Sequence, residues 1–457
     1  MFLDSSRPSH VMTTLLSLPV ETTQLILGYL SADDLRAFRQ TCRDINAKTF
    51  SRFARTYFQT RYVMLEKESL NTLIHISEHP LLGPEVRTLG LCTDHFPEPE
   101  DDLRESQSLW SIMAGYSDSD GLDLWPSGEL SMWPEDDDDD DDDDILNQSY
   151  ATTYRRNFDA QEDFLSGPDI EALGRAMSRL SNCTTLLLTD ACIPWGAARL
   201  EREIGELDRG LGYDDAGSER FVKHVLHVML TAANASKLPL EELCIYLGQE
   251  DRPQTKSPIG FHLLDLPPGH MAQSESRSDI TSLTTLKLLA SPPFEKTSEE
   301  NDSAPTWSQN LTRFIGLFPH LAHFSLAFSN DFDLQTISPC LYSVLSIPQL
   351  RKLELARLEV TESELAGLLL RHQSTLEEIS LREVMMDDKV SWTMLLKKIE
   401  QMPQVHGVTL KDCWLSALNR RGVTHDYELS AVYIRNRQGF KEAIAMVEEL
   451  EMIWNLD

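Results

Sequence analysis

Apolar residues recur along the chain in a six-residue pattern, apolar-x-x-apolar-x-apolar. This spacing is typical of a short strand with one buried face, because strand side chains alternate between two faces. The pattern occurs eight times and ends at Leu91, Leu188, Ile245, Leu288, Leu326, Leu355, Leu381 and Leu410. The last three steps are 29, 26 and 29 residues. One copy carries little information, but an even period predicts repeated units that stack side by side.

Helical segments stand between the predicted strands. Thr361 begins one, with Glu364 at the capping-box position, and residues 392–402 form another. Strand, turn and helix at a fixed period predict an α/β solenoid in the period range of leucine-rich repeats. The asparagine that usually follows the pattern in such repeats is missing, so we expect degenerate repeats. Earlier steps are longer, and polar segments near 248–279 and 291–308, which we expect to be flexible loops, explain the excess.

The N-terminal region predicts three short helices. Pro19 suits the first position of the first helix, and Ser31 with Asp34 predicts a capped second helix. The second helix carries one apolar stripe, formed by Leu35, Phe38, Cys42 and Ile45. A third stripe is formed by Phe50, Phe53, Ala54, Tyr57 and Phe58. A unit this small buries little surface alone, so we expect its apolar faces to need a partner or the following domain.

This segment resembles an F-box. The positions that match are Leu15, Leu18, Pro19, Glu21, Ile26, Leu30, Ser31, Asp33, Asp34, Leu35, Cys42 and Arg43. The resemblance implies an all-α unit over 13–60 that docks on the Skp adaptor of a cullin-based ubiquitin ligase. It also implies an adaptor-binding face, formed by Leu18, Pro19, Glu21, Ile26, Leu30, Leu35, Cys42 and Arg43. An ordinary N-terminal helical hairpin is the alternative.

Negative charge is concentrated in one part of the chain. The 457 residues carry a formal net charge of −32, and residues 94–144 contain 20 acidic residues and one basic residue, Arg104. Nine consecutive aspartates follow Glu135. A run of like charges repels itself, so we predict a disordered acidic insertion over 94–160. This insertion is either a solvated loop or a segment that attracts a basic partner. The overall charge argues against a nucleic-acid partner, which needs a basic surface.

Cysteine usage and hydropathy indicate a location. The seven cysteines are scattered and odd in number, which is typical of reduced core thiols in a cytoplasmic or nuclear protein. No run of 18 apolar residues is present, and the N-terminus lacks the features of a secretory signal. We therefore expect no membrane partner.

The sequence contains no common catalytic motif. It has no G-x-S-x-G, no phosphate-binding glycine loop, no H-E-x-x-H and no C-x-x-C. The pairs His224/His227 and His320/His323 have helical spacing, but each lacks a third ligand, so exposed helix histidines are favoured over a metal site. We expect no catalytic residue, no metal and no cofactor, and an enzyme with a divergent site is the least favoured reading.

The combination resembles the F-box proteins of filamentous fungi that carry degenerate leucine-rich repeats. The implied layout is the F-box, then connecting helices and a first repeat over 61–93, the acidic insertion, and a repeat domain over 161–457. This resemblance implies a non-catalytic substrate receptor of a Skp-cullin-F-box ubiquitin ligase, with the adaptor, a cullin and an unknown protein cargo as partners. A leucine-rich interaction scaffold outside a ubiquitin ligase is the alternative.

A cargo face follows from strand alternation. Residues that alternate with the buried leucines point to the opposite face of the sheet. There we expect Arg382 and Lys411 as neighbours, flanked by Lys352, with Trp414 past the last strand. Such a basic spot fits an acidic or phosphorylated cargo segment, although plain solvated surface is the commoner role for such residues.

Overall fold

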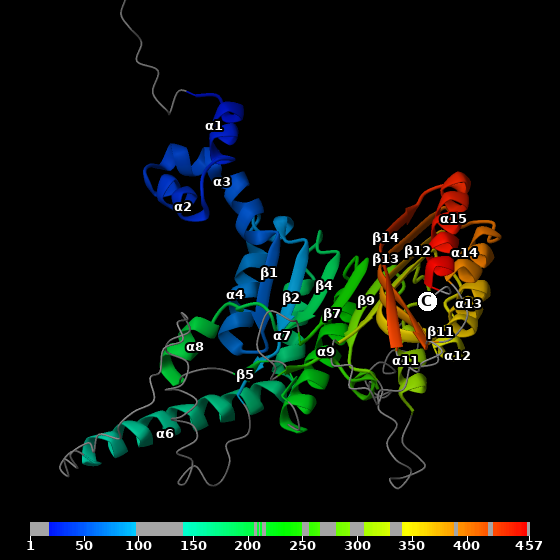
Figure 1. Cartoon of the computed structure of the whole chain (residues 1–457). Coiled ribbons are helices and arrows are strands. Elements are labelled where there is room, and N and C mark those ends of the chain that lie inside the picture. Colours follow the sequence, from blue (N-terminus) through cyan, green and yellow to red (C-terminus); the bar gives the residue numbers. More distant parts are fainter. Residues whose placement is uncertain are drawn as a thin grey trace, which may run out of the picture.

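The protein is an α/β protein built around one ten-stranded sheet (Figure 1). The computed structural model describes residues 18–96, 140–204, 208–209, 211–212, 216–248, 256–265, 280–292, 306–329, 341–387, 392–418 and 424–454. The α/β class predicted from the sequence is confirmed.

The ten strands follow one another in the sheet in chain order. They are β1 (Thr60–Met64), β2 (Thr88–Cys92), β4 (Thr185–Thr189), β7 (Glu242–Tyr246), β9 (Thr285–Ala290), β10 (His323–Phe328), β11 (Lys352–Thr361), β12 (Glu378–Asp387), β13 (Gly407–Leu418) and β14 (Thr424–Ile434). Each pair of neighbours is parallel except β13 and β14, which are antiparallel. The last two apolar positions of all eight patterns fall on strands. β14 carries the same spacing at Leu429, Val432 and Ile434, which is not among the eight, whereas β1 carries no such pattern.

The middle apolar position of each pattern lies in register with that of the next strand. This ladder runs through Leu89, Leu186, Leu243, Leu286, Phe324, Leu353, Ile379 and Val408. Each of these side chains is 2% exposed or less. The ladder belongs to one continuous apolar core, and it fixes the register because a slip of one residue would turn every side chain to the other face.

Helices cover this apolar face. They are α4 (Lys67–Glu78), α7 (Pro168–Met177), α9 (Ala216–Ser236), α11 (Trp307–Ile315), α12 (Leu341–Val344), α13 (Glu362–Arg371), α14 (Trp392–Glu400) and α15 (Arg437–Trp454). Their buried side chains join the same core as the strand ladder. Figure 1 shows α13, α14 and α15 on one side of the last strands. The capping box predicted at Thr361 and Glu364 is present at the start of α13.

The connections differ at the two rims of the sheet. From α7 onward, the connections from a covering helix to the next strand of the main sheet, such as 178–184 and 401–406, have five to seven residues. The strand-to-helix connections vary much more in length. No residue separates β11 from α13, whereas other connections include 97–139, 293–305 and 330–340, which lie outside the described residues. The rim at the carboxyl ends of the strands therefore takes up most of the variation in chain length.

Three helices precede the sheet. They are α1 (Val20–Leu27), α2 (Ala32–Gln40) and α3 (Arg43–Phe58). The backbone N–H of Asp34 donates to the Ser31 hydroxyl at 3.1 Å, so the predicted cap of α2 is confirmed. The single stripe predicted from Leu35 to Ile45 is wrong, because the chain turns at Cys42, the N-cap of α3. Leu35 and Ile45 are both buried, but Leu35 lies on α2 and Ile45 on α3.

The predicted disordered insertion is wrong at both of its ends. Asp94 and His95 form β3, and Asp94, His95 and Phe96 are all buried. The Gln161 side chain accepts from the Phe96 N–H at 3.0 Å and donates to its carbonyl at 3.1 Å. Gln161 lies on α6 (Asp140–Leu165), which begins inside the acidic run. Only residues 97–139 of the predicted insertion lie outside the described part of the chain.

Smaller elements complete the fold. β5 (Asp208–Arg209) pairs with β3, and β6 (Leu211–Gly212) pairs with β8 (Lys256–Ser257). Helix α8 (Ala197–Ile204) lies over the opposite face of the sheet, where Met64, Phe96, Ala197 and Leu200 form a second apolar cluster. Short 3₁₀ helices span η2 (Gly83–Glu85) and η3 (Phe261–Leu264). Because η3 is mostly buried, the loop predicted at 248–279 is not flexible throughout.

Three neighbouring strands share an unusual backbone position. Arg357, Glu383 and Asp412 all have positive φ angles, of 59°, 53° and 51°. They lie between register pairs of β11, β12 and β13, so the left-handed residues stand side by side. At each of these positions the strand has one extra residue, which interrupts the alternation of inward-facing and outward-facing side chains. Buried residues such as Leu355 and Leu358 are therefore three positions apart instead of two. A left-handed conformation costs a residue with a side chain about 1 kcal/mol, so contacts must offset it.

Substitution to glycine separates backbone strain from contact energy at this position. The Glu383 carboxylate lies 2.9 Å from Arg357 Nε and 3.3 Å from Arg382 Nε, whereas Asp412 makes one 3.7 Å contact to Lys411. We expect Asp412→Gly to leave the free energy of unfolding unchanged or raise it by up to about 1 kcal/mol. Glu383→Gly should lower it by roughly 1–2 kcal/mol, because the ion pairs outweigh the strain relief. Urea unfolding checks both variants, and equal effects would contradict this assignment.

Candidate functional site

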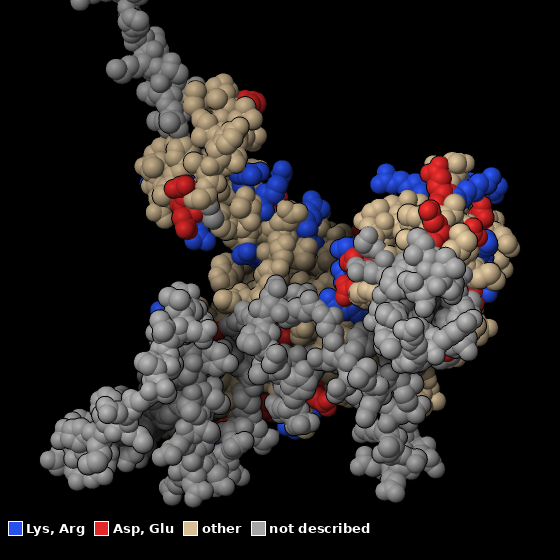
Figure 2. All heavy atoms as spheres, in the orientation of Figure 1, with Lys and Arg blue, Asp and Glu red and all other residues tan. Residues whose placement is uncertain are grey.

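The α1–α3 unit exposes large apolar side chains on α1 and just after it. Val20 is 44% exposed, Leu25 71% and Tyr29 90%. Much of the visible surface of this unit is uncharged (Figure 2). Apolar side chains gathered on one small unit are typical of a surface that another protein covers.

The predicted adaptor-binding residues are distributed unevenly over the unit. Leu18, Ile26 and Leu30 are half-buried, and Pro19, Glu21, Cys42 and Arg43 are exposed. Leu35 is only 3% exposed. Its assignment to the docking face is therefore wrong, because its side chain belongs to the interior of the unit.

Sequence reasoning missed Leu25 and Tyr29. A signal for them was present, since the apolar residues of α1 and the turn after it do not fit a single helical stripe. The side facing the other two helices is occupied by Leu27, which is 2% exposed. An apolar side chain outside that stripe indicates a second surface to be covered.

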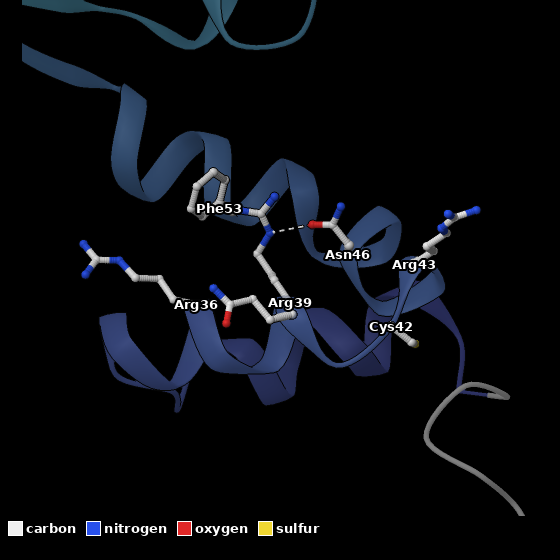
Figure 3. A pocket seen from close by; sticks show the side chains of 7 residues that line it. Arg36, Arg39, Cys42, Arg43, Asn46 and Phe53 are labelled. Carbon is white, nitrogen blue, oxygen red and sulfur yellow. Dashed lines mark hydrogen bonds between the residues drawn. The ribbon is translucent and has the colours of Figure 1, made fainter.

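A second feature of the unit is a hollow of about 580 Å³ between α2 and α3. Arg36, Arg39 and Arg43 line it (Figure 3). The Arg39 guanidinium lies 3.3 Å from the centroid of the Phe53 ring and donates to Asn46 Oδ1 at 3.0 Å. Burial lowers the pKa of Arg39. Because an aromatic face attracts a cation, this stacking holds Arg39 in place, while Arg36 and Arg43 point to either side.

The face of the sheet opposite the helices forms the second candidate region. The outward-facing side chains of neighbouring strands line up in register. They form three rows across this face, one row for each outward-facing position along a strand. The predicted cargo residues Arg382 and Lys411 are direct register neighbours there. Both are about half-exposed, with 46% and 51% of the side chain accessible.

Two predicted members of the cargo site lie apart from this pair. Lys352 is in register with Glu378 and not with Arg382, so it does not flank the pair. Its Nζ lies 2.7 Å from Glu354 Oε1, and this ion pair balances the charge of Lys352. Trp414 is half-buried on β13, and its carbonyl accepts from the Trp392 indole N–H at 3.3 Å. The structure therefore brings together two of the four predicted residues.

Glu354 is the centre of an ion-pair group on this face. Its carboxylate lies 3.4 Å from His323 Nε2 and 2.7 Å from Lys352 Nζ. These two partners, with His323 the larger effect, lower the pKa of Glu354 to about 2 against the opposing effect of burial. A second pair nearby joins Lys287 Nζ and Glu242 Oε1 at 2.6 Å.

Next to this group the sheet is hollowed. A cavity of about 500 Å³ lies over β7 to β12, with Tyr246 at one end and Arg382 at the other. Its floor is made of small residues, Ser325, Ala327, Ala356 and Ser380. Burial raises the pKa of the Tyr246 phenol. The sequence alone did not predict this cavity, since it depends on which strands become neighbours.

The histidine pairs occupy different environments. His224 on α9 contacts the buried Asp169 carboxylate, with 2.6 Å between Nε2 and Oδ2. The second pair does not share a helix, because His323 begins β10. Across the described residues, no three histidine, cysteine, aspartate or glutamate side chains are grouped so that they could hold a metal ion. No helix in this part of the chain has the length and apolarity needed to span a membrane.

Comparison with known proteins gives no further assignment. No model of a protein family matches the chain, and no curated protein matches it. The functional argument therefore depends on the two surfaces described above.

The low pKa of Glu354 predicts a pH dependence of stability. A carboxylate whose folded pKa of about 2 lies below its unfolded value of about 4.3 stabilises the folded state above pH 4.3. That contribution is lost as the pH falls toward 2. Glu354→Gln should therefore lower the free energy of unfolding by about 1 kcal/mol at pH 7, because the side chain is partly exposed.

The difference between Glu354→Gln and the wild type should shrink between pH 5 and pH 3. Urea unfolding at pH 7, 5 and 3 measures it. Glu378→Gln is the matched control, because Glu378 is 51% exposed and 3.9 Å from Lys352. A pH-independent deficit in Glu354→Gln would show that packing, not charge, sets its contribution.

Proposed function

We propose that this chain is the substrate-recognition subunit of a Skp-cullin-F-box ubiquitin ligase. In this proposal α1–α3 are the F-box, and the sheet with its helices is a leucine-rich-repeat-like solenoid that holds cargo. The observation that carries the proposal is the exposed apolar surface of Val20, Leu25 and Tyr29 on a three-helix unit. It supports the sequence resemblance, because a unit that docks on an adaptor must present such a surface.

The connection between the two parts fits this role. One residue, Gln59, separates α3 from β1, and its carbonyl accepts from the backbone N–H groups of Arg87 and Thr88 at 2.8 and 3.0 Å. Helix α3 thus leads directly into the sheet, as Figure 1 shows. A receptor built this way presents bound cargo at a fixed orientation relative to the adaptor. It contributes proximity, while the catalytic groups belong to other subunits, and it acts in the cytoplasm or nucleus.

Substitution of the exposed α1 side chains tests the adaptor contact. We expect Leu25→Ser with Tyr29→Ser to weaken binding to a recombinant Skp-type adaptor roughly 30-fold, since two central apolar residues of an interface are worth about 2 kcal/mol. Thermal unfolding should be nearly unchanged, because both side chains are exposed in the isolated chain. Titration calorimetry measures the affinity.

Tyr433→Ser provides the control for this experiment. Tyr433 is 65% exposed on β14, far from α1 in the chain, and its loss should leave adaptor binding at the wild-type level. Undiminished binding of the Leu25 and Tyr29 double variant would reject the docking surface. If the wild-type chain does not bind the adaptor at all, a role as an interaction scaffold outside a ubiquitin ligase is favoured.

A further inference from the structure

The two edges of the sheet differ in what lies beside them. At the first strand, β1, the Tyr62 carbonyl accepts from the Trp195 N–H at 3.2 Å. The Met64 N–H donates to the Ser69 hydroxyl, also at 3.2 Å. The chain itself therefore closes this edge, which is how proteins keep an edge strand from pairing with another chain.

At the other end of the sheet, one hydrogen bond shows which way the backbone groups of β13 point. The Gly407 N–H donates to the carbonyl of Glu377, the residue directly before β12, at 3.3 Å. Backbone groups of successive residues in a strand point to alternate sides, so Gly407 bonds toward β12. Val408 and Leu410 therefore bond toward β14, the last strand.

The same alternation leaves two residues of β14 with outward backbone groups. Ile434 and Val432 lie opposite the two β13 residues that bond toward β14, so they use their N–H and C=O groups there. The groups of Ala431 and Tyr433 point away from β13. Within the described part of the chain, no residue bonds to them, and both residues are exposed, Tyr433 to 65%. A free edge of this kind accepts a further strand.

The helix layer ends at the same place, as Figure 1 shows for α15 and β14. α14 lies on one flank of α15, where Lys397 Nζ is 2.6 Å from Glu448 Oε1. Met446 and Leu450 stand two residues before and after Glu448, so they lie on the other flank, since successive helix residues are about 100° apart. Met446 is 41% exposed and Leu450 is half-buried.

The outer edge of β14 and this outer flank of α15 together form what we call the open strand position. A strand placed there would bond to Ala431 and Tyr433. Because strand side chains alternate, every second one would face the helix layer and contact Met446 and Leu450. Apolar residues at alternate positions fit this surface best, as they do on the eight strands of the ladder.

One end of the open strand position is basic. Arg435 and Arg437 follow β14 directly, and both are exposed. Neither has an acidic partner among the residues that the structure describes. A segment that pairs with β14 is therefore stabilised by acidic residues at the end that lies beside these two arginines.

A second copy of this chain fits the open strand position less well than a segment of another protein. Each copy has a formal net charge of −32, so two copies repel each other. A short extended segment adds only its own few charges, and its acidic end meets the basic end of the position. These charges favour another protein as the source of the added strand.

From these observations we propose that β14 binds an extended segment of another protein, which joins the ten-stranded sheet as one more strand. The segment has apolar residues at alternate positions and acidic residues at the end beside Arg435. This inference deepens the proposed function by naming the cargo feature that the receptor recognises. It rests on that function only for calling the partner cargo.

A display experiment with the full chain tests the proposal. The probe is a library of random ten-residue segments, each fixed in a flexible linker so that neither end is free. The selected segments should share alternating apolar residues with aspartate or glutamate at one end. No enrichment, or an enriched motif with helical spacing of its apolar residues, would overturn the proposal.

A synthetic peptide from the selected pool then shows whether its backbone is recognised. Single N-methylation of every second amide should weaken binding about tenfold, because those N–H groups bond to β14. Methylation of the amides between them should leave the affinity nearly unchanged, since they point away. Fluorescence anisotropy measures the affinity, and equal effects at all amides would reject strand addition.

Substitutions in this chain locate the binding edge. Tyr433→Pro removes an N–H that the sheet does not use, so the fold should persist while peptide affinity falls about tenfold. Tyr433→Thr is the matched control, because it keeps the N–H and removes only the ring. Thermal unfolding verifies that both variants are folded.

A second variant avoids any change to the backbone. Met446→Glu places a charge on the outer flank of α15 and should weaken binding of the apolar peptide about tenfold. Met394→Glu is its control, since Met394 is 48% exposed on α14. Full affinity of Met446→Glu would show that the peptide does not lie beside α15 and would reject the open strand position.

Sedimentation of the chain without peptide distinguishes the two possible occupants. We expect a monomer. A dimer that Tyr433→Pro dissociates would overturn the proposal, because a second copy would then occupy the edge.

Peptide binding is measured without the adaptor, so the two proposals fail separately. A chain that binds extended segments but not the adaptor would keep this inference and lose the ubiquitin-ligase role. Adaptor binding without any enriched peptide would do the reverse.

Discussion

Ladders of apolar side chains across the sheet hold this protein together. Leucine or a similar residue occupies the same register position on eight successive strands, from Leu89 to Val408, and helices cover the ladder from one side. No strand has a complete core of its own, so each depends on its neighbours for burial. The first and last strands have a neighbouring strand on one side only, so other elements must cover the core at the two ends of the sheet. α3 and β1 lie at one end, while β14 and α15 close the other.

The sequence predicted the strands of the ladder because their signal is local. A six-residue apolar pattern specifies a strand with one buried face wherever it stands. β1, an end strand with a neighbouring strand on one side only, lacks the pattern. Local sequence patterns also did not predict the burial of Asp94 or the helix α6 that begins in the acidic run. There a distant contact, the Gln161 side chain on the Phe96 backbone, outweighs the local preference of a charged segment.

The candidate sites were predicted only in part, for a related reason. Strand alternation correctly placed Arg382 next to Lys411. It could not place Lys352, because the distance along a strand matters as much as the face, and Lys352 lies at the level of Glu378. In the helical unit, the residues that match the F-box pattern include Leu35, a core residue. Apolar character alone does not distinguish a residue that is buried inside the unit from one on a surface that a binding partner covers.

The unequal rims of the sheet have a consequence for how such a chain changes over evolutionary time. The short helix-to-strand connections set the spacing of the ladder, so a residue gained or lost there would shift a strand out of register. On the opposite rim, loop-closure entropy grows only slowly with length, and an insertion leaves every strand where it was. Homologous chains should therefore diverge in length after their strands and agree in length before them. The rim that tolerates insertions also borders the cavity face, so new loops can reshape that face without rebuilding the scaffold.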